Sequence, residues 1–260
     1  MATQFPGVAL VTGAASGIGR ATALAFASAG CPKIALSDRN HEGLLETKTA
    51  IEQLSASETC VIQTDLLDEN QIVRMVEATV RLWGRVDYAV NAAGILGNNA
   101  PSTETSLAQF DLITNINYRG AWLCSRAEIG QMQKQEPLEG KSVRGAVVNI
   151  ASQLGLVGRR DAPAYCASKA AVIAMTKCDA IDYAQHNIRI NCVCPGVIAT
   201  PMTQSDPSFA AALGPAIAMA PMNRMGTAEE VAAACLWLCG DGAGFVCGHA
   251  LVVDGGYTIN

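Results

Sequence analysis

The stretch Val8-Ala9-Leu10-Val11-Thr12-Gly13-Ala14-Ala15-Ser16-Gly17-Ile18-Gly19 decides the fold of this 260-residue chain. It begins as a short apolar run typical of a buried parallel strand, and a helical stretch from Arg20 to Ala29 follows it. Glycines at such a junction permit a tight turn and a close approach of the backbone to a pyrophosphate, which the helix N-terminus attracts. The spacing G-x-x-x-G-x-G differs from the commoner G-x-G-x-x-G, so a plain turn is the alternative. The strand before and the helix after favour a dinucleotide site at Gly13, Ser16, Gly17 and Gly19.

Short apolar runs alternate with longer helical stretches along the whole chain, as in a parallel sheet that is covered on both faces. No linker or repeat divides the sequence. We therefore predict an α/β fold over residues 1–260, a single-domain doubly wound Rossmann fold with a seven-stranded parallel sheet flanked by helices on both faces. The expected strands are Val8–Thr12, Lys33–Ser37, Cys60–Gln63, Val86–Asn91, Ala146–Ala151, Ile188–Val193 and Ala250–Val253.

Two helical stripes are expected to face the core of this fold. The residues that form them are Val73, Val76, Val80 and Trp83 in one helix and Val231, Ala234, Cys235 and Leu238 in a helix near the C-terminus.

Asp38, at the end of the second strand, bears on the choice of coenzyme. A carboxylate about twenty residues past the glycine turn accepts hydrogen bonds from an adenosine ribose and repels a 2′-phosphate, which favours NAD. Arg39 is the argument for NADP, because a guanidinium there would bind that phosphate, although Ser16 supplies no second cation in the turn. Asp38 as a cap of the next helix is the purely structural alternative.

Composition excludes several other classes of protein. With 18 basic against 23 acidic residues and no basic cluster, the chain offers little to a nucleic acid or an anionic membrane. No signal peptide or spanning helix is apparent, so we expect a cytoplasmic protein. The ten scattered cysteines fit reduced, buried thiols better than a disulfide scaffold. Without a Cys-x-x-Cys pair, and with only three scattered histidines, no metal site is expected.

Tyr165 and Lys169 carry the expected chemistry, together with Ser152 upstream. Positions four apart share one face of a helix, so the ammonium of Lys169 can stabilise the phenolate of Tyr165. Bringing a phenol from its ordinary pKa of about 10 to neutrality requires roughly 4 kcal/mol, and one cation in a dry pocket supplies much of that. The arrangement is typical of acid/base chemistry accompanying hydride transfer.

With Thr12-Gly13-x-x-x-Gly17-Ile18-Gly19, Asn91-Ala92-Ala93-Gly94, Ser152 and Tyr165-x-x-x-Lys169 in this order, the chain resembles the short-chain dehydrogenase/reductase family, in its compact NAD(P)-dependent type of about 250 residues. The resemblance covers essentially the whole chain. It continues through Asn191-Cys192-Val193-Cys194-Pro195-Gly196 and Asp254-Gly255-Gly256.

The resemblance implies a catalytic role for four side chains. Tyr165 would be the general acid/base, Ser152 would bind the substrate oxygen, and Lys169 would also hold the nicotinamide ribose. Asn117 would anchor a water in a proton relay from Lys169 to solvent; Asn115 is the rival, and a satisfied amide inside a helix is the structural alternative.

The resemblance also extends the coenzyme site beyond the glycine turn. It places Ile18 at the pyrophosphate, Asp65 and Leu66 at the adenine, and Asn91, Ala92 and Gly94 along the adenosine side. The alternative role of Asn91 is structural, to tie neighbouring strands together. Tyr165, Lys169 and the segment with Pro195, Gly196, Ile198 and Thr200 would hold the nicotinamide half.

These residues predict an oxidoreductase that transfers a hydride between NAD and a secondary alcohol or ketone. By family likeness, residues 197–225 form a substrate lid. Its apolar side chains suggest a bulky apolar substrate that is steroid-like, terpenoid or polyketide-like, although they could equally pack against the protein or a neighbouring subunit; they are Met202, Phe209, Leu213, Ile217, Met219 and Met222.

Two alternatives to this function stay open, an NADP-dependent ketoreductase and a non-catalytic NAD-binding sensor.

The charged segment Arg159-Arg160-Asp161 is either solvated or approaches an acidic substrate group or a subunit contact. We expect a homo-tetramer, as is common in the family, through helices at about 106–133 and 163–184, with a dimer as the second choice.

Overall fold

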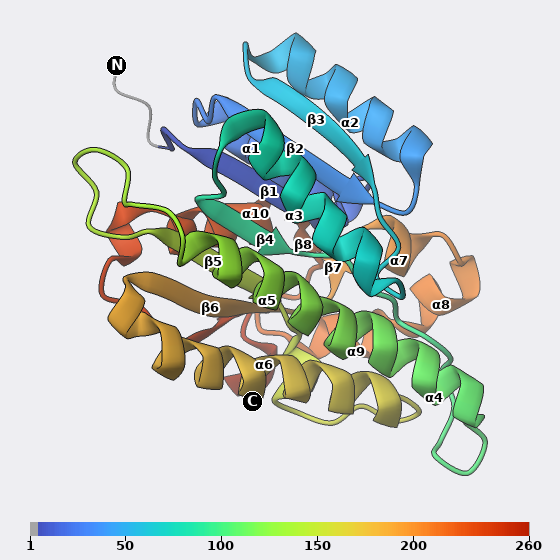
Figure 1. Ribbon diagram of the computed structural model, residues 1–260. Helices are drawn as coiled ribbons and strands as arrows, with labels where there is room; N and C mark the ends of the chain where they lie inside the picture. Colours follow the sequence, from blue (N-terminus) through green and yellow to red (C-terminus); the bar gives the residue numbers. More distant parts are fainter. Residues whose placement is uncertain (1–4, 260) are drawn as a thin grey trace.

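The alternating pattern of the sequence is realised as one parallel sheet with helices on both faces in the computed structural model, which describes residues 5–259 (Figure 1). The strand order is β3-β2-β1-β4-β5-β6-β9, and every neighbouring pair is parallel. The seven strands are β1 Val8–Thr12, β2 Lys33–Asp38, β3 Glu58–Gln63, β4 Tyr88–Asn91, β5 Gly145–Ile150, β6 Ile188–Pro195 and β9 Ala250–Val253. The predicted seven-stranded Rossmann sheet is confirmed, with ends that differ by a few residues.

Three long helices cover each face of this sheet. One core cluster joins the sheet to α1 (Gly17–Ser28), α2 (His41–Leu54) and α10 (Ala228–Cys239). The clusters on the opposite face involve α3 (Glu69–Trp83), α5 (Ala121–Met132) and α6 (Pro163–Tyr183), which lie in front of the sheet in Figure 1. Both faces of the central strands are thus buried, which explains why these strands read as continuous apolar runs. The edge strands β3 and β9 are only partly buried.

Shorter elements complete the chain around these layers. They are α4 Leu107–Thr114, a π-helical turn η1 Asn115–Gly120, the 3₁₀ turns η2 Gln153–Gly155, η3 Ala184–His186, η4 Asp241–Ala243 and η5 Tyr257–Ile259, the helices α7 Pro201–Gln204, α8 Pro207–Ala212 and α9 Gly214–Met219, and a small pair of strands, β7 Ile198–Ala199 and β8 Gly226–Thr227. Residues 197–225, the expected lid, therefore consist mainly of three short helices.

The strand order reverses between β1 and β4. From β1 the chain runs outward through β2 and β3, then returns to β4 and continues through β5 and β6 on the other side. In doubly wound sheets ligands bind in the crevice beyond the carboxyl ends of the strands at this switch point. The fold thus opens a crevice beside the glycine-rich turn, which follows β1.

Two local expectations need correction. Within the stripe expected in α3, only Val73 departs from the core, at 40% exposed. Val76 is buried, and Val80 and Trp83 pack partly buried against the core cluster. The helix also buries Ile72, Met75 and Thr79. All ten cysteines are free, but Cys178 and Cys247 are exposed, so burial does not hold for every thiol.

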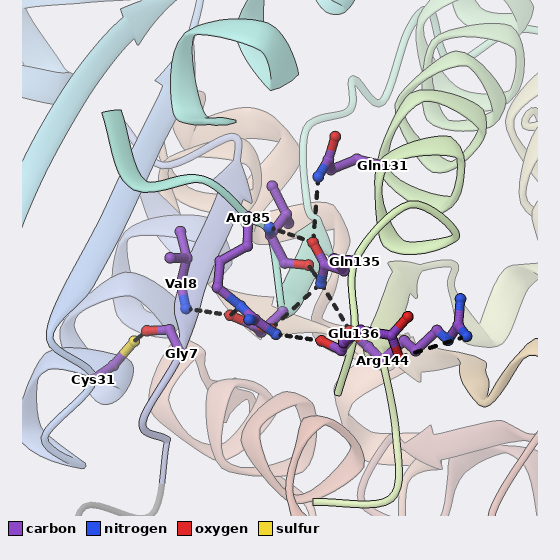
Figure 2. Close-up of polar contacts among 10 residues, drawn as sticks. Gly7, Val8, Cys31, Arg85, Gln131, Gln135, Glu136 and Arg144 are labelled. Atoms are coloured by element: carbon purple, nitrogen blue, oxygen red, sulfur yellow. Dashed lines mark hydrogen bonds and ion pairs between the residues drawn. The ribbon is translucent and has the colours of Figure 1, made fainter. Parts of the chain in front are cut away.

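The edge of the sheet at the amino ends of the strands is closed by a buried polar cluster (Figure 2). Gln135 is hydrogen-bonded to both backbone groups of Val86, at 3.1 Å to the N–H and 2.7 Å to the carbonyl. Asp87 accepts a 2.8 Å bond from the N–H of Val8 and is paired with Arg85. These bonds fasten β1 and β4 at the end away from the crevice, which leaves the carboxyl ends for a ligand.

Among residues 5–259, no helix combines the length and the apolar character needed to cross a bilayer.

Candidate active site

The glycine-rich turn between β1 and α1 is shaped so that only glycine fits at key positions. Gly13 has φ +70°, and a Cβ there would lie 2.7 Å from the backbone N of Ala93. A Cβ on Gly19 would lie 2.2 Å from the carbonyl oxygen of Gly13. Ser16 precedes α1 without a capping side-chain bond, so the first N–H groups of that helix remain free to bind an anion.

This turn forms one wall of a cavity of about 320 Å³ at the switch point. Ser37, at the carboxyl half of β2, also lines the cavity, and its buried hydroxyl has no hydrogen-bond partner among residues 5–259. Of the coenzyme residues predicted from the sequence, those that line this cavity are Gly13, Ser16, Gly17, Ile18, Gly19, Asp38, Asp65, Leu66, Ala92, Gly94 and Thr200. An anion-binding turn, a carboxylate and an unpaired hydroxyl in one crevice fit a dinucleotide.

Asp38, at the end of β2, lies in the wall of this cavity. Its carboxylate accepts bonds from the backbone N–H of Ala15 at 3.2 Å and of Asn40 at 2.9 Å. The cap of α2 is Asn40, whose side chain accepts from Gly43, so the capping alternative for Asp38 does not hold. Arg39 lines the same cavity, as the competing NADP argument requires.

Asn91 points away from the cavity. Its amide nitrogen donates to Glu128 at 2.9 Å and to Asn149 at 3.1 Å, and the side chain is 4% exposed. This arrangement ties the ends of β4 and β5 to α5 and corresponds to the structural alternative for Asn91.

A second cavity, of about 140 Å³, adjoins the first and contains the expected acid/base residues. Ser152 lies where β5 leads into η2, and Tyr165 and Lys169 lie on one face in the first turns of α6. All three line this cavity, as do the predicted nicotinamide residues Pro195, Gly196, Ile198 and Thr200. The fold thus brings the ends of β5 and β6 and the start of α6 together.

The pKa shifts of Tyr165 and Lys169 differ from those expected from the sequence. Burial raises the pKa of Tyr165 above its ordinary value, and the hydrogen bond with Ser152 only partly offsets this. Burial also lowers the pKa of Lys169 to about 8. The ammonium nitrogen donates to the carbonyl of Ile150 at 2.8 Å and lies 5.9 Å from the centre of the Tyr165 ring. The expected depression of the phenol pKa is not found, because desolvation outweighs the hydrogen bond with Ser152 and the positive charge of Arg159.

Asn117 lies in the π-helical turn η1 and lines neither cavity. Its side chain exchanges two 2.8 Å bonds with the backbone of Ile95 and donates to Ser168 at 3.2 Å. A Cβ on Gly94 would lie 3.1 Å from the Asn117 side-chain oxygen and 3.6 Å from the Lys169 nitrogen. Asn117 is thus a satisfied amide in the immediate surroundings of Lys169.

Several further residues line the two cavities without having been assigned a site role from the sequence. Gln153 lines the second cavity, is 4% exposed, and has an amide oxygen with no partner. Tyr257 reaches the cavity from the C-terminal turn η5, and Thr12 and Ser37 line the first cavity. Adjacency to Ser152 was the only available signal for Gln153, and no pattern in the sequence marks Tyr257.

Comparison with known proteins supports, over nearly the whole chain, the family resemblance that the sequence motifs indicate. The family model described as enoyl-(acyl carrier protein) reductase matches residues 13–258. The chain is 40% identical over 253 residues to 2-(R)-hydroxypropyl-CoM dehydrogenase of Xanthobacter autotrophicus, covering 96% of this chain and 98% of that protein. It is also 40% identical over 257 residues to cyclopentanol dehydrogenase of Comamonas testosteroni, covering 97% of each.

The fold agrees with that of a solved relative. The crystal structure of levodione reductase superposes with a TM-score of 0.91 at 35% sequence identity, covering 98% of this chain and 99% of that one. The levodione reductase sequence of Leifsonia aquatica is 36% identical over 258 residues, covering 96% of this chain and 94% of that protein. The chain belongs to the short-chain dehydrogenase/reductase family, enzymes that use a nicotinamide dinucleotide to interconvert alcohols and carbonyl compounds.

Proposed function

We propose that this protein is an NAD-dependent dehydrogenase that interconverts a secondary alcohol and its ketone, acting on a bulky, largely apolar substrate. The observation that carries the proposal is the continuity of the two cavities. Six residues line both of them, namely Ile18, Ala92, Gly94, Ile95, Thr200 and Met202. The residues of the first cavity would thus hold a dinucleotide next to the second cavity, which Ser152 and Tyr165 line.

Bound NAD supplies the hydride acceptor at C4 of its nicotinamide ring. During oxidation, the hydroxyls of Ser152 and Tyr165 hold the alcohol oxygen, and the Tyr165 oxygen removes its proton. During reduction, the same oxygen returns the proton to the carbonyl. The Lys169 side chain, in the same cavity wall as Tyr165, would hold the ribose hydroxyls of the bound coenzyme. Asn117, through its contacts around Ile95 and Ser168, supports the route by which the proton leaves for solvent.

Two features support a bulky apolar substrate. Met202, Phe209 and Leu213 of the lid line the second cavity. A neighbouring cavity of about 350 Å³ shares Gln153, Gly196 and Ile198 with it and adds Ile217 and Met222. Apolar walls with adaptable methionines suit a large hydrocarbon body.

Asp38 supports NAD over NADP, because its carboxylate lines the first cavity where a 2′-phosphate would lie. Arg39 in the same wall is the observation that favours an NADP-dependent ketoreductase as the second candidate. A non-catalytic sensor is less favoured, since Ser152, Tyr165 and Lys169 all line one cavity. We further propose that the enzyme works in the cytoplasm.

Absorbance of the reduced nicotinamide tests the proposal directly. The purified enzyme is given NAD or NADP with panels of steroid, terpenoid, polyol and hydroxy-acid alcohols. We expect turnover of large secondary alcohols with NAD, and a weaker apparent affinity for NADP. Tighter binding of NADP would overturn the Asp38 argument, and no turnover of any alcohol or ketone with either coenzyme would favour the sensor.

A further inference from the structure

Arg159 places a cation in the wall of the substrate cavity. The residue lies between η2 and α6 and lines the same cavity as Ser152 and Tyr165. Its guanidinium lies over the ring of Phe209, at 5.9 Å from the ring centre, and donates one hydrogen bond to the Asn99 side chain. The aromatic ring and the amide hold the guanidinium in place without neutralising it.

No carboxylate balances this charge within the part of the chain that the structure describes. None of the ion pairs among residues 5–259 involves Arg159. Apart from Lys169, which donates to Ile150, the described residues place no other charged side chain in the cavity wall. A guanidinium carries five N–H donors, so most of them remain available beside an otherwise apolar space.

The guanidinium also acts within electrostatic reach of the reacting oxygen. Burial raises the pKa of Tyr165, and the hydrogen bond with Ser152 and the positive charge of Arg159 act in the opposite direction. The effect of Arg159 on the pKa of Tyr165 agrees with the geometry, which places both residues in the wall of one cavity.

Arg160, the next residue, lies in solvent, so the loop does not direct every arginine into the cavity wall. Arg160 has a side chain that is 95% exposed, and it lies 3.9 Å from the carboxylate of Asp161. It belongs to neither cavity. The two adjacent arginines therefore form a natural pair for comparison, with one in the cavity wall and one in solvent.

We propose that the substrate of this enzyme is a secondary alcohol or ketone that carries an anionic group, and that Arg159 binds this group. The apolar walls take the hydrocarbon body, and the planar fork of the guanidinium recognises a carboxylate, sulfonate or phosphate through paired hydrogen bonds. This inference rests on the proposed dehydrogenase function and adds the chemical class of its substrate. Arg159 is thus a specificity-determining residue at the end of the cavity that Phe209 covers.

The test compares matched anionic and neutral alcohols. Hydroxy acids with a secondary hydroxyl next to the terminal methyl, from 4-hydroxypentanoate to 8-hydroxynonanoate, are measured against their methyl esters by NAD reduction. We expect the wild-type enzyme to prefer the acid at one or more chain lengths. In R159Q, the ratio of kcat/KM for the acid to that for its ester should fall by about 10- to 100-fold, because any effect of Arg159 on Tyr165 is common to both substrates. R159K should retain part of the preference, and R160Q should retain all of it.

Other outcomes separate this inference from the proposed function. Equal use of acids and esters by the wild-type enzyme at every length would overturn it and leave the dehydrogenase intact. An equal loss for acids and esters in R159Q would also overturn it, because Arg159 would then support the lid or tune Tyr165.

Binding provides a readout that does not need turnover. Calorimetric titration of the NAD complex with heptanoate and with heptanamide should show tighter binding of the carboxylate in wild-type protein and in R160Q, but not in R159Q. That pattern without turnover of any alcohol would refute the dehydrogenase and keep the anion site. Equal binding of heptanoate by wild-type protein and R159Q would refute the anion site.

Discussion

Tyr165 and Lys169 show how far a pair of residues alone specifies chemistry. Their spacing places them on one face of α6, which the sequence predicts, and both line the second cavity. The balance between desolvation and charge depends on the surroundings. Burial shifts the two pKa values toward each other, upward for the phenol and down to about 8 for the ammonium. Such opposite shifts favour the neutral form of both groups.

Tyr165→Phe removes the proton-transfer oxygen and keeps the ring. We expect kcat for alcohol oxidation to fall by about 10²- to 10⁴-fold, because general acid/base catalysis contributes on that scale. The dissociation constant of NAD, measured by fluorescence titration, should change little. The half-buried Tyr183→Phe on the same helix, which lines neither cavity, serves as the control. Turnover within a few-fold of wild type in Tyr165→Phe would contradict the assignment of this residue.

At the scale of single elements, the buried cluster around Glu128 explains the position of α5. Glu128 is fully buried and accepts a 2.9 Å bond from Asn91, whose amide also reaches Asn149. Asn149 in turn donates to Thr176 of α6 at 3.1 Å. One polar cluster thus connects β4 and β5 to two helices, which fixes the strand ends that carry the site.

Glu128 should make stability depend on pH. Burial raises its pKa from 4.5 to about 7, although the bond from Asn91 acts against this. The folded state then binds more protons than the unfolded state between these values, so the contribution is present below about pH 4.5 and lost as pH rises through 7. The full difference corresponds to roughly 3 kcal/mol, at about 1.36 kcal/mol per pH unit.

Glu128→Gln removes this titration. Urea unfolding at pH 5 and pH 8 should show that wild-type protein loses more stability between the two values than Glu128→Gln does. The exposed Glu77→Gln on α3 should behave like wild type. An identical pH dependence in wild type and Glu128→Gln would mean that Glu128 does not titrate as its burial implies.

At the scale of the whole molecule, large apolar side chains remain exposed on the helices expected to form subunit contacts. Leu107 is 74% exposed and Phe110 45% on α4, Trp122 is 39% exposed on α5, and Ile181 is 77% exposed on α6. Exposed apolar groups gathered on neighbouring elements are typical of protein interfaces. They support the proposal of a homo-tetramer formed through these helices.

Ile181→Asp tests that proposal. A charge buried in an apolar interface without a partner is costly, so we expect light scattering to report a smaller assembly than for wild type. Leu54→Asp, at another exposed apolar site on α2, should leave the assembly unchanged. The same mass for wild type and Ile181→Asp would exclude α6 as a subunit contact, and a monomeric wild type would refute the tetramer.

The sequence by itself determined the sheet and the glycine turn, and it predicted that Tyr165 and Lys169 share one helix face. These depend on local properties: continuous apolar runs, glycine at positions where a Cβ would collide with backbone, and helical spacing. Periodicity misplaced one edge of the buried face of α3, where Ile72 is buried and its apolar neighbour Val73 is 40% exposed. Neighbouring apolar residues leave the orientation of a helix undecided.

Only the tertiary structure decided which polar groups share a cavity and which are satisfied elsewhere. Asn91 donates a hydrogen bond to Glu128, and Asp38 lines the first cavity without capping α2. Arg159 lies over the ring of Phe209, which is distant in sequence. Each depends on contacts between elements far apart along the chain, and on how burial competes with charge in the assembled site. Both the contacts and the balance of burial and charge arise only when the helices and strands have packed together.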